Sequence, residues 1–152
     1  MTVRRDLVVS AVVGLLLTGA VAGCDQSEEE RRADYCAAVS AAAEELTRTA
    51  DEGGAGAFLD ALPTLEELAQ QSPSDLKDEW QTYLGALENL RDVLAEAEVE
   101  PDELGDGVPR RLSKAQRQRV EGAVRLVRSD KTAAAAAGIT QQALDVCDTQ
   151  LL

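Results

Sequence analysis

The chain has 152 residues, with 15 basic and 28 acidic side chains and a formal net charge of −13. It contains no histidine, which excludes a Ser-His-Asp triad, a histidine general base and any histidine-ligated metal site. The overall acidity argues against nucleic acid as a partner, because phosphate binding needs a basic surface. A hydrophobic fraction of 45% is normal for a globular protein, and the length fits one domain.

The first 23 residues have the pattern of a secretory signal peptide. Arg4 and Arg5 form a short positive region, and the stretch from Leu7 to Ala20 is almost entirely apolar. This stretch is too short to span a bilayer comfortably and is typical of the apolar core of a signal peptide. We therefore expect residues 1–23 to be removed on export.

The signal peptide ends in Val21-Ala22-Gly23-Cys24, which resembles the lipobox of bacterial exported lipoproteins. In that family an aliphatic residue and two small residues precede an invariant cysteine. The resemblance implies cleavage before Cys24, a diacylglycerol on its sulfur and acylation of the new N-terminus, for example with palmitate. The resemblance implies a location on the extracytoplasmic face of the cell membrane. The acyl chains would anchor the protein there, because each buried methylene contributes about 0.8 kcal/mol.

The composition carries a second likeness. The chain holds 25 alanines and 12 arginines but only 3 lysines. In this respect it resembles the small alanine-rich lipoproteins of actinobacteria. The likeness is one of amino-acid composition, without a shared motif, and it implies no activity.

Two cysteines, Cys36 and Cys147, remain after Cys24 is assigned to the lipid. An even remainder in an exported protein predicts a disulfide. The loop closed by this bond would stabilise the fold by roughly 4–5 kcal/mol in the chain-entropy model. A redox role is the alternative, but the chain has no CxxC motif and no histidine that would activate a thiol.

The mature chain is more acidic than the whole. Removal of residues 1–23 takes away two arginines and one aspartate, which leaves 13 basic and 27 acidic residues and a net charge of −14. We expect residues 24–32 to form the lipidated cysteine and a polar tether. Residues 33–152 then form the domain.

The apolar residues of this domain recur at three- and four-residue spacings, which predicts helices. The expected segments are 29–50, a shorter one with Phe58 and Leu68 on its apolar side, 73–97, and a last region from 113 to 147. Pro63 should kink the second segment or open its second half. Ser129 and Asp130 would interrupt the last region.

Polar residues at the starts of two segments predict helix caps. Ser72, with Asp75 three residues later, should cap the third segment, and Ser113 with Gln116 should form a capping box for the fourth. The fold class is therefore all-α: a small up-and-down bundle of four helices, or five if the last region divides. With an even number of helices, the start of the first helix and the end of the last lie at the same end of the bundle, as the Cys36–Cys147 disulfide requires.

Basic residues are concentrated in one part of the acidic chain. Residues 110–131 carry eight basic and two acidic side chains. Five basic residues and Glu121 recur at three- and four-residue spacings and would share one helical face. The five basic ones, here called the basic stripe, are Arg110, Lys114, Arg117, Arg125 and Arg128. The stripe could dock an anionic partner, such as lipid headgroups, a cell-wall polymer or an acidic envelope protein. Alternatively, it could neutralise acidic helices of the same bundle, which is the commoner arrangement.

Two other groups of residues could bind a ligand. Asp102, Glu103, Asp106 and Gly107 could contribute to a calcium site, although their spacing does not match an EF-hand and a solvated acidic surface is more typical. Trp80 and Tyr83 could line a pocket, but large residues on a helical stripe usually belong to the core.

The chain shows no nucleophile motif and no glycine-rich phosphate loop, so we expect neither an enzyme nor a bound cofactor or metal. The leading hypothesis is a non-catalytic interaction or accessory module held at the cell surface. The alternative is an extracytoplasmic binding protein for a small ligand or a cation.

Overall fold

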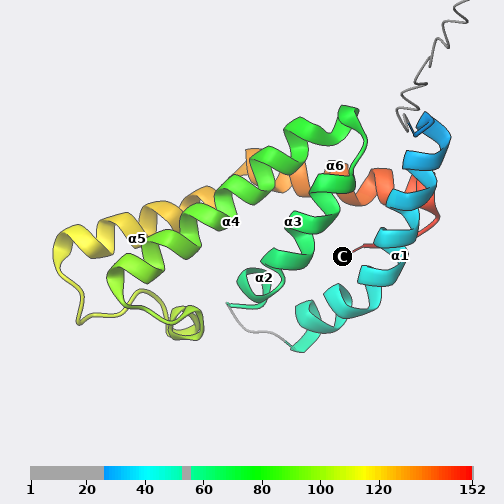
Figure 1. Cartoon of the computed structure of the whole chain (residues 1–152). Helices are drawn as coiled ribbons and strands as arrows, with labels where there is room; N and C mark the ends of the chain where they lie inside the picture. The colour runs from blue at the N-terminus through cyan, green and yellow to red at the C-terminus, as the bar shows by residue number, and fades with distance from the viewer. Residues whose placement is uncertain (1–25, 53–55, 152) are drawn as a thin grey trace, which may run out of the picture.

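The computed structural model describes residues 26–52 and 56–151, and within these ranges the regular structure is entirely helical (Figure 1). The predicted signal peptide, the lipobox and Cys24 lie outside the described residues. No helix within the described ranges is long and apolar enough to cross a bilayer. In chain order the elements are α1 (Glu28–Glu52), α2 (Ala57–Asp60), α3 (Leu62–Gln71), the 3-10 turn η1 (Ser74–Leu76), α4 (Lys77–Ala97), the 3-10 helix η2 (Pro101–Asp106), α5 (Lys114–Val127) and α6 (Asp130–Cys147).

Helix α1 begins at Glu28, one residue before its predicted start, and Ser27 and Glu30 form a capping box there. The backbone N–H of Ser27 donates to Glu30 Oε2 at 2.8 Å, and the backbone N–H of Glu30 donates to Ser27 Oγ at 3.2 Å. The backbone hydrogen bond from Ser27 holds the pKa of Glu30 below its usual value. Residues 29–32, where the predicted tether and the predicted first helix overlap, are helical.

The predicted boundaries of the other helices are partly confirmed. Ser113 and Gln116 form the predicted capping box, in which the backbone N–H of Gln116 donates to Ser113 Oγ at 3.3 Å. Ser129 separates α5 from α6, as predicted, and its Oγ accepts the backbone N–H of Thr132 at 3.2 Å. The predicted cap at Ser72 is wrong, because Ser72 ends α3 and its hydroxyl donates to the Ala69 carbonyl at 2.8 Å.

The second predicted segment divides at Ala61, and Pro63 lies in the first turn of α3. A proline is tolerated in a first turn because the backbone N–H that it lacks would have no helical partner there. Of the two effects predicted for this proline, the structure therefore shows the second, the opening of a new helix.

Helices α1, α3 and α4 alternate in direction along the chain, and α5 and α6 together form the returning segment (Figure 1). Helices α5 and α6 follow one another along α4 in the direction opposite to it, and α4 packs against both. The first helix and the end of the last meet at one end of the molecule, where a disulfide joins Cys36 to Cys147 with the two Cα atoms 5.1 Å apart. The prediction of an all-α bundle closed by one disulfide is confirmed.

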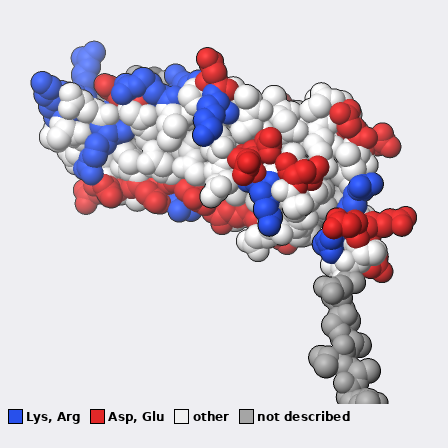
Figure 2. Space-filling model, turned by 90° about the horizontal axis from the view of Figure 1, so that it is seen from above, with Lys and Arg blue, Asp and Glu red and all other residues white. Residues whose placement is uncertain are grey.

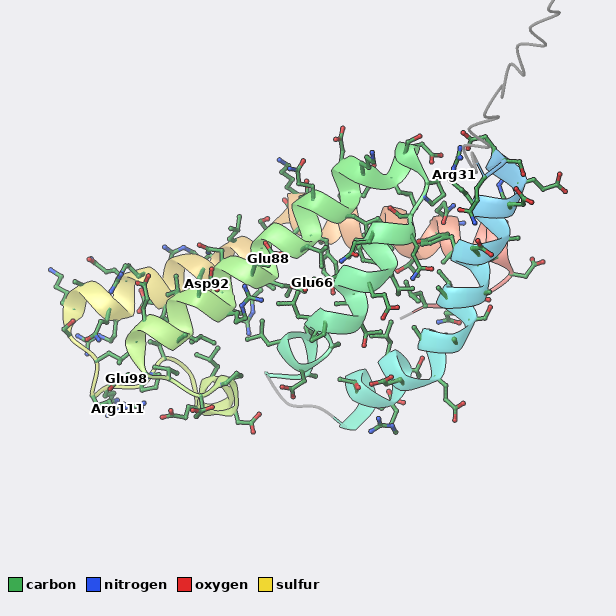
Figure 3. All side chains as sticks on the ribbon, in the orientation of Figure 1. Arg31, Glu66, Glu88, Asp92, Glu98 and Arg111 are labelled. Carbon is green, nitrogen blue, oxygen red and sulfur yellow. A yellow bond between two sulfur atoms is a disulfide. The ribbon has the colours of Figure 1, made fainter. Side chains whose placement is uncertain are left out.

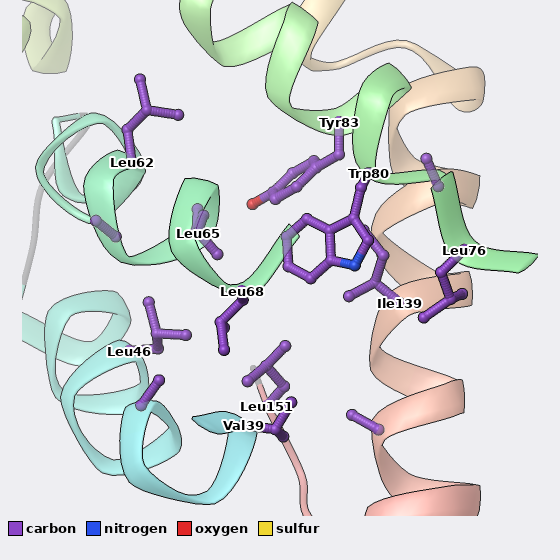
Figure 4. Close-up of a cluster of buried hydrophobic side chains, with 14 of the residues drawn as sticks. Val39, Leu46, Leu62, Leu65, Leu68, Leu76, Trp80, Tyr83, Ile139 and Leu151 are labelled. Atoms are coloured by element: carbon purple, nitrogen blue, oxygen red, sulfur yellow. The ribbon is translucent and has the colours of Figure 1, made fainter. Parts of the chain in front are cut away.

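One core cluster, here called the disulfide-end cluster, joins α1, α3, the first half of α4 and the second half of α6 around Trp80 and Tyr83 (Figure 4). The chain turns back after α6 at Asp148, which has a left-handed φ of 51°. This turn brings Leu151 into the cluster, where its side chain is fully buried. Ser40 Oγ and Thr149 Oγ1 lie 3.1 Å apart and tie the tail to α1.

A second cluster, here called the distal cluster, lies at the other end of α4. It is formed by the second half of α4, by α5 and by the connection between them: Leu90, Leu94, Ala97, Val99, Leu112, Val120 and Ala123. Arg111 closes that connection, because its Nη2 donates to the Glu98 carbonyl and to Glu103 Oε1, each at 2.9 Å (Figure 3). These hydrogen bonds from Arg111 hold the pKa of Glu103 below its usual value.

Two large apolar residues, of which Phe58 was predicted on the apolar side of its helix, are partly open to solvent. Phe58 on α2 is 42% exposed, and Leu144 on α6 is 48% exposed. The periodicity of a single helix does not reveal how wide a face its neighbours cover. Val99 and Leu151, which lie outside the predicted helices, are buried instead.

Candidate interaction surface on helix α5

The basic stripe lies on the surface of α5 and of the loop that precedes it. Arg110, Lys114, Arg125 and Arg128 are exposed, and Arg117 is half-buried. The stripe follows the helix from Lys114 to Arg128, a length of about 21 Å at the helical rise. At its start the Arg117 guanidinium donates to the Arg110 carbonyl at 3.3 Å, which connects the loop to the helix.

The stripe has no carboxylate partner at ion-pair distance among the described residues. Two other basic residues of the same segment do have carboxylate partners: Arg111 pairs with Glu103, and Arg119 pairs with Glu96 of α4 at 2.6 Å. No contact in this part of the chain therefore supports the hypothesis that the stripe neutralises acidic neighbouring helices. Its charges are accessible to an anion from outside.

Apart from Glu121, which is exposed between Arg117 and Arg125, charges of opposite sign are largely separated on this part of the surface. Figure 2 shows basic side chains gathered at the end of the molecule where α5 begins, with acidic side chains along the adjacent edge. Asp92 and Glu96 of α4 are exposed on the neighbouring helix. A cluster of one sign produces a local potential that attracts and orients molecules of the opposite charge.

An apolar groove adjoins the stripe. It has a volume of about 390 Å³ and lies between α2, α4, η2 with the loop that follows it, and α5. Its lining is apolar except for Arg128: Phe58, Leu90, Leu104, Val108, Val124 and Val127. Arg128 belongs to both the stripe and the groove, and it follows Val124 by four residues, so the two share one face of α5.

Sequence reasoning missed this groove. Its walls come from four elements that are separate in the sequence, and Phe58 was expected to face the core. Helix α2 is only four residues long and buries Ala57, which leaves the ring of Phe58 at the groove. No local pattern could have indicated this arrangement.

Trp80 and Tyr83 belong to the disulfide-end cluster, as the core interpretation predicted. Their side chains are 2% and 7% exposed, and burial raises the pKa of Tyr83 to about 12. Burial also raises the pKa of Tyr35, an effect that the indole N–H of Trp80 partly offsets. Both that N–H and the Tyr35 hydroxyl are buried, and neither has a partner at hydrogen-bond geometry among the described residues.

The loop that contains η2 offers little to a cation. Glu103 is held by Arg111, and the side chain of Asp106 lies outside the described residues. No group of three or more metal-ligating side chains occurs in the described part of the chain.

Comparison of the chain with protein-family models, with curated proteins and with solved structures found no match.

Proposed function

We propose that the protein is a membrane-anchored extracytoplasmic lipoprotein that works as a non-catalytic interaction module, with α5 as its docking surface for an anionic partner. The observation that carries this proposal is the basic stripe, which is accessible and has no carboxylate partner among the described residues of an acidic chain. Accessible charge of one sign speeds association with an oppositely charged partner and orients it.

The position of the stripe favours an envelope protein or polymer over the lipid headgroups of the same membrane. Helix α1 begins at Glu28, and the four residues from Cys24 span at most about 14 Å, so a lipid anchor would hold this end near the bilayer. Helix α5 begins at the opposite end of the molecule (Figure 1). Helix α4, which connects the two ends, is about 30 Å long.

The second candidate function is the binding of a small ligand, and it also has an observation in its favour. The apolar groove has a volume of about 390 Å³, within the usual range for small-molecule sites of about 300–1,000 Å³. A cation, the other ligand considered, has no comparable support among the described residues.

The anchor is tested by Cys24→Ser. Because the sulfur is the expected attachment point of the diacylglycerol, the variant should leave the membrane fraction or remain unprocessed. A matched Ser74→Ala variant, which loses no cap hydrogen bond, retains Cys24 and should stay in the membrane fraction. Unchanged membrane retention of Cys24→Ser would contradict the anchor.

The docking surface is tested by chemical cross-linking in the cells that produce the protein, followed by mass spectrometry. We expect one dominant partner that is lost when Arg117, Arg125 and Arg128 are changed to Glu. The control is Arg31→Glu/Arg32→Glu/Lys77→Glu, which changes the net charge equally near the start of α1 and of α4. A partner that survives the stripe variant, or that the control abolishes equally, would argue against docking on α5.

A further inference from the structure

We propose that the partner binds as an acidic amphipathic helix, whose apolar side fills the groove while its carboxylates pair with the basic stripe. This inference rests on the docking function proposed above and specifies the chemistry of its partner. It goes further because it assigns the groove, and Phe58 in particular, to the same interface as the basic side chains.

The first argument is the position of the groove on α5. Val124 lines the groove, and Arg117 and Arg128 lie seven residues before it and four residues after it, so all three share one face of the helix. On the other flank of the same helix, Arg119 is paired with Glu96 of α4. The accessible positive charge therefore borders the groove and not the opposite, ion-paired side.

The second argument is length. The stripe extends about 21 Å along α5, which is close to four helical turns. A headgroup or another small anion contacts one or two guanidinium groups, whereas a helix with carboxylates at three- and four-residue spacing can follow the entire stripe. Helix-in-groove recognition uses apolar residues at the same spacings.

The third argument is the combination of charge with apolar surface. Phe58 is 42% exposed at the groove, and exposed aromatic residues are frequent energetic centres of interfaces. A purely polar anion would leave the apolar lining in water, and a purely apolar ligand would leave the stripe without a counter-charge.

The experiment is site-specific photo-cross-linking in the cells that produce the protein. A photoreactive phenylalanine replaces Phe58 in the groove, Arg117 in the stripe, or Leu144, which is an exposed apolar residue on α6 and serves as the control. Mass spectrometry identifies the cross-linked segment. We expect positions 58 and 117 to capture the same acidic segment, with apolar residues at helical spacing, and position 144 not to capture it.

The captured segment is then synthesised and titrated against the purified protein. We expect Phe58→Ser to weaken binding at least tenfold at both low and high salt, because it removes apolar contact. Arg125→Glu/Arg128→Glu should weaken binding most at low salt, because salt screens the remaining interaction. A peptide of the same composition, scrambled so that its apolar residues share no face, should bind at least tenfold more weakly.

Failure of this inference is distinguishable from failure of the docking function. Capture from position 117 but not from position 58 would overturn the groove assignment and leave docking on α5 intact. Capture of a lipid, of a second copy of the chain or of a segment without an acidic amphipathic pattern would also overturn it. Absence of capture from both positions would overturn both proposals.

Discussion

The two core clusters of this protein are built in different ways. The disulfide-end cluster joins residues from the two ends of the described chain, from Tyr35 to Leu151, and it lies beside the Cys36–Cys147 bond. The distal cluster draws mainly on one continuous stretch, the second half of α4 and α5 with their connection. The disulfide-end cluster joins segments that are distant in the sequence, whereas residues packed against the distal cluster line the apolar groove.

The physical basis of this difference is chain entropy. Joining segments that are far apart in the sequence costs loop-closure entropy, which a disulfide reduces by constraining the unfolded chain. The α4–α5 hairpin closes a short loop and relies on a capping box and on the contacts of Arg111. Its partly buried apolar residues, among them Leu104, Val108 and Val124, are the ones that line the groove.

The largest expected effect concerns the disulfide-end cluster alone. Cys36→Ser/Cys147→Ser should lower the free energy of unfolding by about 4–5 kcal/mol, because the loop between the two cysteines is long. Denaturant unfolding measures the change. Amide hydrogen exchange should rise more in α1 than in α5 when local opening is measured under native conditions. Equal acceleration in both helices would show that the two clusters open together.

A second, smaller effect should follow from alkaline pH. Burial raises the pKa of Tyr83 to about 12, above its usual value near 10, so the folded state holds the phenolic proton more tightly than the unfolded state. Its contribution is complete below about pH 10 and is lost progressively towards pH 12, by about 2–3 kcal/mol. Tyr35 shifts in the same direction, whereas the distal cluster contains no tyrosine.

This alkaline loss is measured by unfolding curves between pH 9 and pH 12. Tyr83→Phe should reduce the slope of stability against pH in that range, because the titrating hydroxyl is removed. An unchanged slope in the variant would exclude Tyr83 as the source of the pH dependence.

The smallest expected effect concerns the distal cluster. Ser113→Ala removes the side chain that accepts the backbone N–H of Gln116, and it should cost about 1 kcal/mol. The first turn of α5 should exchange its amide hydrogens faster, while α1 should be unaffected. The control is Ser74→Ala, because no side-chain cap hydrogen bond starts η1, and it should change stability by less than about 0.5 kcal/mol.

Local patterns predicted the helices well where the responsible residues are close in the sequence. The Ser113–Gln116 capping box and the break at Ser129 each depend on atoms within a few residues, and both were found. The prediction failed at Ser72, where the same kind of residue ends one helix instead of starting the next. A serine between two helices can cap the end of the first or the start of the second, and the path of the chain determines which helix it caps.

The sequence by itself determined the helical class, the pairing of Cys36 with Cys147 and the common spacing of the basic stripe, because these follow from periodicity and from the number of cysteines. The accessibility of the stripe, the position of Phe58 at a groove and the burial of Leu151 depend on how the helices pack. Exposure depends on which neighbouring elements cover a face, and those neighbours come from distant parts of the chain. The surface that we propose for docking is therefore a property of the packed helices and not of α5 alone.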